Sequence, residues 1–415
     1  MMKIGAVATE RGEKMLFSVK NVGQIAEAKV KFGDLTVLVG AQGSGKSIFL
    51  QLFKLCKDQE YIKNTMADFG QDWNQNDNAD LISVYMGSGT KQLWRSGSNV
   101  RITPPDRKFS ARMQSGGKRA AAESVYYIPA QRALTMPYGR PEPFRAYDSG
   151  TPFAVKNFSE HLRLYIDKNA KNRETLFPLS GKLKQPVKDA LNEAIFHDAS
   201  VSQISAAGQK ELRLRIRGGE EDSPGISYMA WSAGQREFFP LLLGCYELLP
   251  GGKSTKDERF DCVVIEEPEM GLHPKAIFAV MTLTADLLSR GYKVILSTHS
   301  PSVLDIVWAV RTIKAQKKLS TPEKTALLQK LFFLRQQSSG GTYDMLVSLL
   351  EKSFSTYYFY YDNAENAFVK TKDISILDPG DDDEKISGWG GLSGFSGHAA
   401  DVVADAVERS ENAGK

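Results

Sequence analysis

Cysteine, histidine and long apolar segments are all scarce in this sequence of 415 residues. Its three cysteines have neither the spacing of a metal site nor that of a disulfide framework, which fits a reducing compartment. His161, His197 and His398 have no neighbouring motif, so we expect no metal–histidine centre. The longest apolar runs, residues 238–243 and 307–310, are far too short to cross a bilayer, and no signal peptide is visible. We therefore expect a cytoplasmic protein with no membrane partner.

A strong excess of charge of one sign is also absent. The 53 basic and 49 acidic residues leave a net charge of +4, which argues against a histone-like binder. Basic residues nevertheless concentrate in residues 91–145, with about eleven lysines and arginines against three acidic residues. This stretch is rich in Gly, Pro and Ser, so we expect loops and short strands. A DNA-binding surface and a solvated or protein-docking face both remain open for it.

Short apolar strands alternate with helices in two parts of the chain. Residues 35–39 form a β-branched run that ends in glycine, and helical spacing follows over residues 47–56. Residues 262–265 and 294–296 are further buried strands, with a predicted helix over residues 277–290 between them. This alternation predicts an α/β fold with a parallel core sheet.

Antiparallel segments are expected beside this core. Residues 15–22 and 24–32 predict one hairpin, and residues 211–217 and 226–231 predict another. The polar residues 71–80 predict a loop. Further predicted elements are a helix over 235–248, with Pro240 tolerable only near its first turn, helices over 321–334, 343–353 and 399–410, and strands over 356–361 and 367–377.

The octet at residues 40–47 matches G-x-x-x-x-G-K-[ST] between a buried strand and an amphipathic helix. Its glycines allow backbone N–H groups to surround a β-phosphate, and the following helix adds its positive end. Lys46 would reach the β- and γ-phosphates, and the Ser47 hydroxyl would bind Mg²⁺. We therefore expect ATP and Mg²⁺ here. The predicted nucleotide-binding residues of this phosphate loop are Gly40, Ala41, Gln42, Gly43, Ser44, Gly45, Lys46 and Ser47.

The buried strand that begins at Cys262 ends in two glutamates, Glu266 and Glu267. Such a strand delivers acidic side chains to the carboxyl edge of a sheet, beside the phosphate loop. We expect Glu266 to contact Mg²⁺ through water and Glu267 to polarise the attacking water. The usual order at these positions is Asp then Glu. Because Glu266 is longer than the usual aspartate, the sequence does not predict the rate of ATP turnover. A solvated acidic turn is the simpler alternative.

Three further segments complete the predicted site. Ser232 is placed as the N-cap of the next helix, and Gly234 and Gln235 belong to the same small-residue motif, which lets a phosphate approach closely. His299 ends an apolar strand and can hydrogen-bond a γ-phosphate. Gln131 follows a short strand and is a candidate to contact the metal and the lytic water. An ordinary helix cap and a structural histidine are the alternatives for Ser232 and His299.

These elements, in this order, resemble the ABC-type ATPase heads of the SMC, RecF and OLD-like families. The similarity is strongest to OLD-like ATPases of the AAA group. In those proteins the acidic strand is followed by Pro-Glu and Gly-Leu-His-Pro, here residues 271–274, and the histidine by Ser-Pro. The resemblance implies a head that dimerises face to face, in which Ser232 of one subunit caps the γ-phosphate held by Lys46 of the other. It covers residues 13–60, 124–135 and 226–305.

Departures from these families shape the expected domains. About 185 residues with little heptad character separate the phosphate loop from Ser232, unlike the coiled-coil arms of SMC proteins. Residues 381–383 are acidic, but no Toprim pattern precedes them, so we expect no nuclease. The expected layout is an ABC-type head with a mixed or antiparallel lobe over residues 1–310, a basic and helical lobe inserted at about 61–225, and an α+β C-terminal extension over 311–415 for oligomerisation or partner docking.

The resemblance implies a slowly hydrolysing ATPase that forms dimers or larger oligomers and controls a separate effector such as a Toprim nuclease. The ATPase subunit of a PARIS-type anti-phage system, with DNA or a phage protein as trigger, is one such arrangement. One alternative is a RecF-like DNA-binding repair clamp, supported by the basic stretch. Another is a transporter ATPase subunit, but the Pro-Glu and Ser-Pro motifs of this chain do not resemble those of that family.

Overall fold

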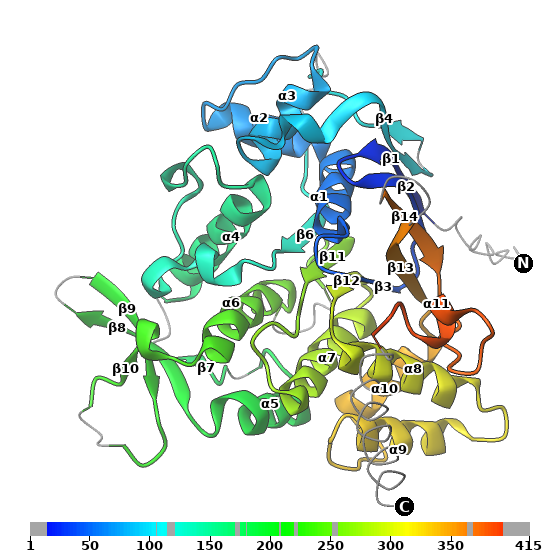
Figure 1. The fold of residues 1–415 in the computed structure, drawn as a ribbon. Coiled ribbons are helices and arrows are strands. Elements are labelled where there is room, and N and C mark those ends of the chain that lie inside the picture. Colours follow the sequence, from blue (N-terminus) through cyan, green and yellow to red (C-terminus); the bar gives the residue numbers. More distant parts are fainter. Residues whose placement is uncertain are drawn as a thin grey trace, which may run out of the picture.

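The computed structural model describes residues 15–104, 106–113, 121–170, 175–179, 181–206, 209–219, 223–250, 256–362 and 368–392. Within these residues the main body is a ten-stranded sheet in the order β5-β4-β1-β2-β14-β13-β3-β12-β11-β6 (Figure 1). Its strands are β1 Leu16–Val22, β2 Ile25–Lys31, β3 Leu35–Gly40, β4 Trp94–Thr103, β5 Arg107–Lys108, β6 Val125–Ile128, β11 Cys262–Glu266, β12 Lys293–Thr298, β13 Phe354–Asp362 and β14 Phe368–Asp373.

Five neighbouring strands, β13, β3, β12, β11 and β6, pair in parallel and form the core of this sheet. Successive residues of each strand alternate between two hydrophobic cores. In β3, Val37 and Val39 join one core and Leu38 joins the other. A strand that is buried on both faces needs apolar residues at every position, which explains the continuous apolar runs in the sequence.

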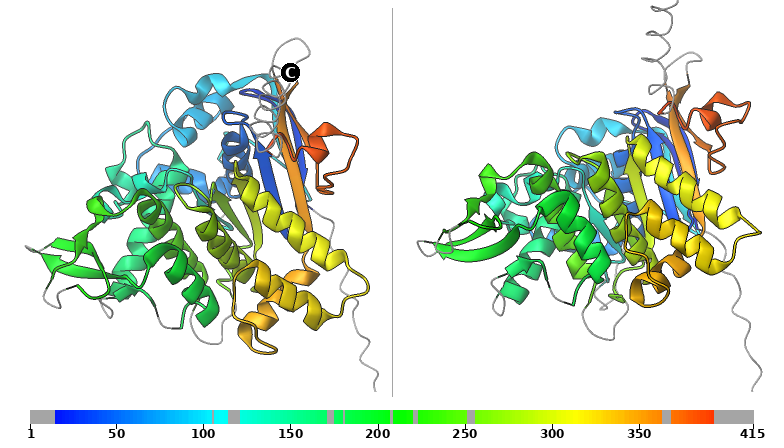
Figure 2. Two further views of the ribbon diagram at one scale, coloured as in Figure 1. Left: turned by 60° about the horizontal axis from the view of Figure 1, so that its bottom comes forward. Right: turned by 90° about the horizontal axis from the view of Figure 1, so that it is seen from below.

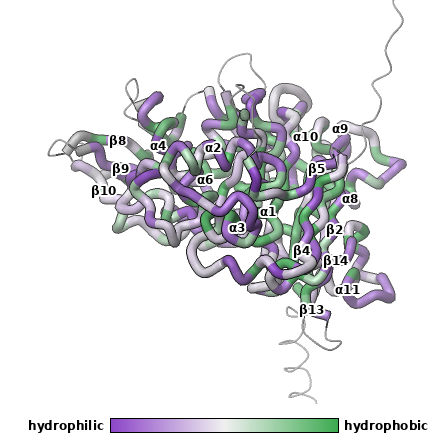
Figure 3. The backbone as a smooth tube through the Cα atoms, turned by 90° about the horizontal axis from the view of Figure 1, so that it is seen from above, coloured by the Kyte–Doolittle hydropathy of each residue, from purple (hydrophilic) through white to green (hydrophobic). Residues whose placement is uncertain are grey.

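Helices cover both faces of the sheet. The core that contains Val37 and Val39 includes residues of α4 to α10, and the core that contains Leu38 includes residues of α1, α2 and α3. Figure 3 shows the apolar segments gathered inside and the hydrophilic segments mostly at the periphery. The helices are α1 Lys46–Lys57, α2 Gln59–Asp68, α3 Asn78–Met86, α4 Phe153–Ala170, α5 Gln185–Leu191, α6 Ala233–Leu248, α7 Pro274–Ser289, α8 Pro301–Ala315, α9 Thr321–Leu331, α10 Gly341–Glu351 and α11 Glu384–Ser387.

A second, antiparallel sheet has the strand order β10-β9-β8-β7. It lies at one end of the molecule, away from β13 and β14 (Figure 2). The expected hairpin is present, because Ile226 of β10 pairs with Leu214 of β9. The expected second strand, residues 226–231, is shorter, since a 3-10 helix begins at Tyr228. The strands are β7 Thr175–Phe177, β8 Ser200–Ala206, β9 Gln209–Arg215 and β10 Ile226–Ser227.

Local sequence patterns predicted most elements but not all of their bounds. The first hairpin is confirmed as β1 and β2. The loop expected over residues 71–80 is shorter, because α3 begins at Asn78 with the Asp77 side chain as its N-cap. The expectation for Pro240 is wrong, since it lies well inside α6. Proline cannot donate to the carbonyl of Arg236, four residues earlier, and the Tyr228 hydroxyl donates to that carbonyl instead, at 3.2 Å.

The sequence predicts a domain boundary at residue 310. Helix α8 runs through it, and β13 and β14 pair with β3 and β2 inside the main sheet. Strand β6 falls within the inserted lobe expected at about 61–225, and it pairs in parallel with β11 in the core of the sheet. Pairing between segments so far apart along the chain leaves no local signal in the sequence.

The predicted helix over residues 399–410 lies outside the described residues. None of the helices within the described ranges is long and apolar enough to cross a membrane.

Candidate nucleotide-binding site

The phosphate loop connects the buried strand β3 to helix α1, as expected. Its backbone requires glycine, because Gly40 has a φ of 151° and a Cβ there would lie 2.3 Å from the carbonyl oxygen of Phe359. Gly45 also has a positive φ, of 85°, and a Cβ there would meet Ile25 at 3.0 Å. The loop therefore follows a path that other residues would block, with Gln42 and Gly43 exposed at its tip.

The side chain of Lys46 folds back over the phosphate loop. Its Nζ donates to the carbonyl oxygens of Gly40 at 2.8 Å and Ala41 at 3.0 Å. Burial lowers the pKa of Lys46 to about 8, although Glu267, Glu269 and Glu266 oppose this shift. The ammonium group is thus held within the loop in front of three carboxylates, which suits a cation that binds phosphate oxygens.

Two side chains from outside the motif hold the tip of the phosphate loop. The carbonyl oxygen of Gly43 accepts hydrogen bonds from Gln24 Nε2 at 2.6 Å and from the Tyr361 hydroxyl at 2.9 Å. Gln24 lies between β1 and β2, and Tyr361 belongs to β13. Sequence reasoning missed both residues, since no motif connects them to the loop.

Strand β11 delivers Glu266 to the carboxyl edge of the parallel sheet, where only 2% of its surface is exposed. Burial raises the pKa of Glu266, whereas the Ser47 hydroxyl, the Ala130 N–H and the Tyr127 hydroxyl act to lower it. Oε2 accepts from the Ala130 N–H at 3.3 Å. Oε1 is buried and accepts no hydrogen bond from the described residues. An unpaired carboxylate oxygen beside a serine hydroxyl fits the hard oxygen ligands that Mg²⁺ prefers.

Glu267 faces His299, with Oε1 3.3 Å from His299 Nε2. The hydrogen bond from His299 lowers the pKa of Glu267, and the charges of His299, Lys46 and Arg132 lower it further. Its backbone has a φ of 44°, which is uncommon for a residue other than glycine. Glu267 is therefore an ionised acceptor held in a constrained conformation at the same sheet edge as Lys46.

Glu269 is a further residue of this site to which the sequence assigned no role. Its Oε1 accepts from the His299 N–H at 2.8 Å and from the Thr298 hydroxyl at 2.7 Å. These bonds fix the end of β12 beside the acidic pair. The motif around Cys262 includes Glu269, so its position, but not its partners, was visible in the sequence.

Among the described residues, Gln131 and the Ser232 motif make no side-chain contact of the kind seen between Glu267 and His299. Gln131 is exposed just after β6, which runs parallel to β11, so it lies at the same edge as Glu266. Ser232 caps α6: its Oγ accepts from the Gln235 N–H at 3.2 Å, and Gln235 Oε1 accepts from the Ser232 N–H at 3.2 Å. Within the described part of the chain, neither the Gln131 nor the Ser232 side chain hydrogen-bonds to the phosphate loop. Gly234 packs instead against Gly271.

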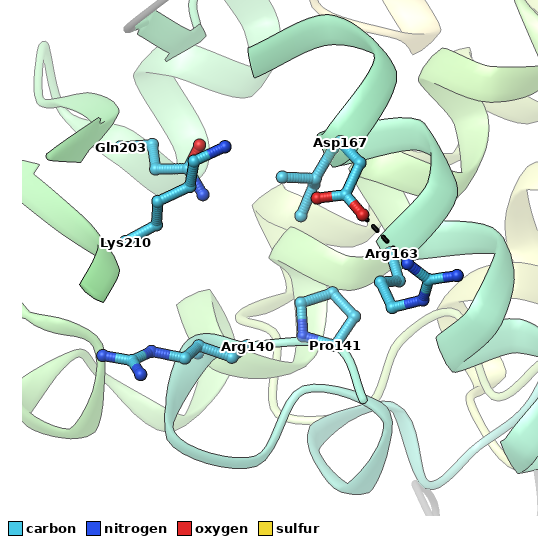
Figure 4. Close-up of a pocket in the computed structure, with 8 residues that line it drawn as sticks. Arg140, Pro141, Arg163, Asp167, Gln203 and Lys210 are labelled. Carbon is cyan, nitrogen blue, oxygen red and sulfur yellow. Dashed lines mark hydrogen bonds and ion pairs between the residues drawn. The ribbon is translucent and has the colours of Figure 1, made fainter. Parts of the chain in front are cut away.

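A cavity of about 320 Å³ lies apart from these motifs, between α4, the segment around residue 140 and strands β8 and β9 (Figure 4). Its lining includes Arg140, Arg163, Asp167, Gln203 and Lys210. Arg163 Nη1 pairs with Asp167 at 2.9 Å, so part of its charge is neutralised within the cavity. None of the residues that line it belongs to the predicted nucleotide motifs.

A parallel sheet whose carboxyl edge carries a phosphate loop, an acidic pair and a histidine, with a capped helix motif before the acidic strand, defines an ABC-type P-loop NTPase head. The chain belongs to the family described as "AAA domain, putative AbiEii toxin, Type IV TA system", whose profile matches residues 35–126 and 131–305.

Parts of this chain are similar to known proteins. The Old nuclease of Escherichia phage P2 is 28% identical over 193 residues, which cover 44% of this chain and 32% of that protein. The chain thus matches about a third of the relative's length. An SMC head bound to the C-terminal winged helix domain of ScpA is 12% identical with a TM-score of 0.36, over 70% of this chain and 90% of that one. An SMC head from Thermotoga maritima, at 14%, has a TM-score of 0.29 over 70% and 90%.

Proposed function

We propose that two copies of this chain bind ATP between them, with Mg²⁺, and hydrolyse it slowly. The observation that carries this proposal is the convergence of Lys46, Glu266, Glu267 and His299 at one edge of the parallel sheet. Family membership supports nucleotide binding by the same segment of chain.

Each residue has a role that follows from its position. Lys46 and the N–H groups of the phosphate loop bind the β- and γ-phosphates. Ser47 and Glu266 would hold Mg²⁺, which would neutralise charge on the phosphate oxygens. Glu267 accepts a hydrogen bond from the attacking water, and its lowered pKa keeps it ionised for this task.

His299 and Gln131 complete the proposed site from the strands on either side of β11. His299, fixed through its backbone by Glu269, donates towards the γ-phosphate or towards Glu267. Gln131 lies after β6, where its amide can contact the metal and the water.

Ser232, Gly234 and Gln235 would act on the nucleotide of the partner copy. The N-terminus of α6 is the positive end of a 16-residue helix, which favours phosphate. Because the capping box already satisfies Ser232 within its own chain, the motif is preformed for such a contact.

The proposal is tested by nucleotide binding and hydrolysis of the purified protein. Lys46→Ala should abolish binding of a fluorescent ATP analogue, whereas Lys57→Ala, on the same helix, should not. Glu267→Gln should retain binding, lower hydrolysis by about 10²-fold or more and accumulate an ATP-bound dimer in size-exclusion chromatography. Unchanged binding by Lys46→Ala, or unchanged turnover by Glu267→Gln, would refute the assignment.

We further propose that ATP-dependent dimerisation of this chain in the cytoplasm controls a separate effector protein. The candidate effector is a Toprim nuclease in an anti-phage system. The similarity to a protein named Old nuclease supports a connection with nucleases. The test is to co-express the chain with a Toprim protein encoded beside it and to measure ATP-dependent co-purification and phage resistance. Resistance that persists with Lys46→Ala would contradict control by ATP.

The DNA-clamp alternative rests on the basic stretch at residues 91–145. Two of its residues are paired locally: Lys91 pairs with Asp77 and Asp80, and Arg101 pairs with Asp106 at 2.7 Å. We therefore keep the ATP-dependent dimer as the proposed function.

A further inference from the structure

Arg132 has the largest fully buried side chain in the described part of the chain, with 0% of its surface exposed. It lies in the short helix η2 (Arg132–Thr135), directly after Gln131. A guanidinium group is buried at a large cost in solvation free energy unless its donors find acceptors. The partners of this group therefore indicate what its burial accomplishes.

The donors of Arg132 are directed at backbone carbonyl oxygens on three segments. Nη1 donates to Glu266 at 2.6 Å and to Pro129 at 3.3 Å, Nη2 donates to Glu267 at 3.0 Å, and Nε donates to Glu237 at 3.0 Å. The Glu237 carboxylate lies 4.0 Å away and balances the charge. One planar group thus bonds to the end of β11, to the loop after β6 and to the second turn of α6.

The carbonyls of Glu266 and Glu267 belong to the two successive peptide groups that follow these residues. These two peptide planes flank the Cα of Glu267, so holding both constrains the φ and ψ angles of Glu267 and the direction in which its side chain leaves the backbone. The first plane also limits the ψ angle of Glu266, at the end of β11. Glu267 has a φ of 44°, a conformation that persists in a non-glycine residue only where its surroundings enforce it. Arg132 supplies part of that constraint, together with the bond from the Glu267 N–H to the Ser297 carbonyl at 2.9 Å.

We propose that Arg132 is a positioning residue that holds Glu266 and Glu267 in their working orientation and joins them to α6. The inference rests on the proposed ATP hydrolysis and adds to it a structural link between the acidic pair and helix α6. Helix α6 begins with the Ser232 motif, so a shift of α6 when that motif engages a nucleotide reaches the acidic pair through one guanidinium group. The Arg132 side chain is fully buried and its hydrogen bonds go to backbone carbonyls, so it acts through the backbone.

The test separates nucleotide binding from turnover. In Arg132→Lys the charge stays, but a single ammonium group cannot span the same carbonyls. We expect the Kd for a fluorescent ATP analogue to stay within about threefold of the wild type while kcat falls by about 10- to 100-fold, the usual effect of losing a residue that orients a catalytic ligand. In a Glu267→Gln background the same change should lower kcat much less than in the wild type, because the part of its effect that passes through the Glu267 carboxylate is already lost.

Lys63→Met is the matched control. Lys63 is also a fully buried cation that donates to a backbone carbonyl, that of Arg112 at 2.6 Å, but it lies in α2. Its loss should lower the Tm and leave kcat per folded molecule unchanged. A kcat for Arg132→Lys within twofold of the wild type, or a parallel loss of kcat in the Lys63 variant, would overturn the inference.

A second measurement uses the wild-type chain and does not depend on the variant folding. Hydrogen–deuterium exchange with and without a non-hydrolysable ATP analogue should show protection changing together in residues 233–240 and 266–270. Protection that changes in one segment alone would refute the link. A wild-type protein that binds no ATP would instead refute the proposed function, so the two failures are distinguishable.

Discussion

His161 lies between two carboxylates, with ring nitrogens 2.7 Å from Glu123 and 3.2 Å from Glu247. Burial would lower the pKa of His161, but these carboxylates raise it to about 10, against 6.5 for an ordinary histidine. The proton is thus bound more tightly in the folded state. Its stabilising effect is complete below about pH 6.5 and is lost as the pH rises from there to about 10. Lys54, which pairs with Glu123 at 2.6 Å, belongs to the same cluster.

We predict that His161→Gln lowers the free energy of unfolding by about 3 kcal/mol near pH 6, because the change removes the cation between two buried carboxylates. Glu123 then keeps only Lys54 as a cationic partner among the residues that the structure describes, and Glu247 keeps Arg259. The difference from the wild type should shrink as the pH rises towards and above 10, because the wild-type histidine loses its proton around its pKa of about 10. Urea unfolding at several pH values measures this. The exposed His197 provides the control, since His197→Gln should shift stability little at any pH. A difference for His161→Gln that does not vary with pH would show that the ion pairs do not cause it.

Single residues of the candidate site were predictable only where chemistry demands a residue type at a fixed spacing. This holds for Lys46, Glu266 and His299, which the structure brings to one sheet edge. Arg132 and Glu269 were not assigned roles, because their partners are backbone groups or residues on another strand. Such hydrogen bonds join segments that are brought together only by the complete fold, so the neighbouring sequence does not predict them.

At the level of elements, the N-terminus of α6 packs on the loop that follows β11 through two glycines. A Cβ on Gly234 would lie 2.6 Å from the carbonyl oxygen of Gly271. That atom belongs to a backbone, so it cannot turn aside as the end of a flexible side chain could. The close approach fixes the position of the Ser232 motif relative to the acidic pair.

We predict that Gly234→Ala pushes α6 away from this loop and destabilises the protein by about 1–3 kcal/mol, the usual effect of overpacking. ATP hydrolysis should fall, while binding at the phosphate loop is retained. Gly341→Ala is the control, since Gly341 also begins a helix but a Cβ there would meet only the Lys184 side chain at 3.6 Å. Thermal unfolding and ATPase assays measure both variants. Equal Tm values for the two variants would argue against the glycine contact.

At the level of the whole molecule, the sheet order interleaves the two ends of the described chain. Strands β14 and β13 lie between β2 and β3, and Tyr361 of β13 donates to the phosphate loop (Figure 1). The sequence predicted these strands from their own alternation and the parallel core from its apolar runs. It did not predict their order, because pairing between distant segments is decided by the packing of the complete sheet.

The proposed dimer can be tested by complementation, because a site shared by two copies and a site within one copy give opposite results. Lys46→Ala removes the phosphate-binding cation, and Ser232→Arg places a bulky side chain at the N-terminus of α6. Each variant alone should be inactive. In a mixed dimer of the two, one shared site carries both lesions and the other carries neither, so a mixed dimer should regain about half of the wild-type activity.

Mixing the two variants at constant total protein should therefore give ATPase activity that peaks at equal proportions. Sites contained within one chain would give none at any ratio, since every chain carries a lesion. Mixing Lys46→Ala with Glu267→Gln provides the matched control. Both of these residues belong to the same half of the site, so neither shared site of their mixed dimer is intact and no activity should return. Recovery in that control as well would show that the subunits do not divide the site between Lys46 and Ser232.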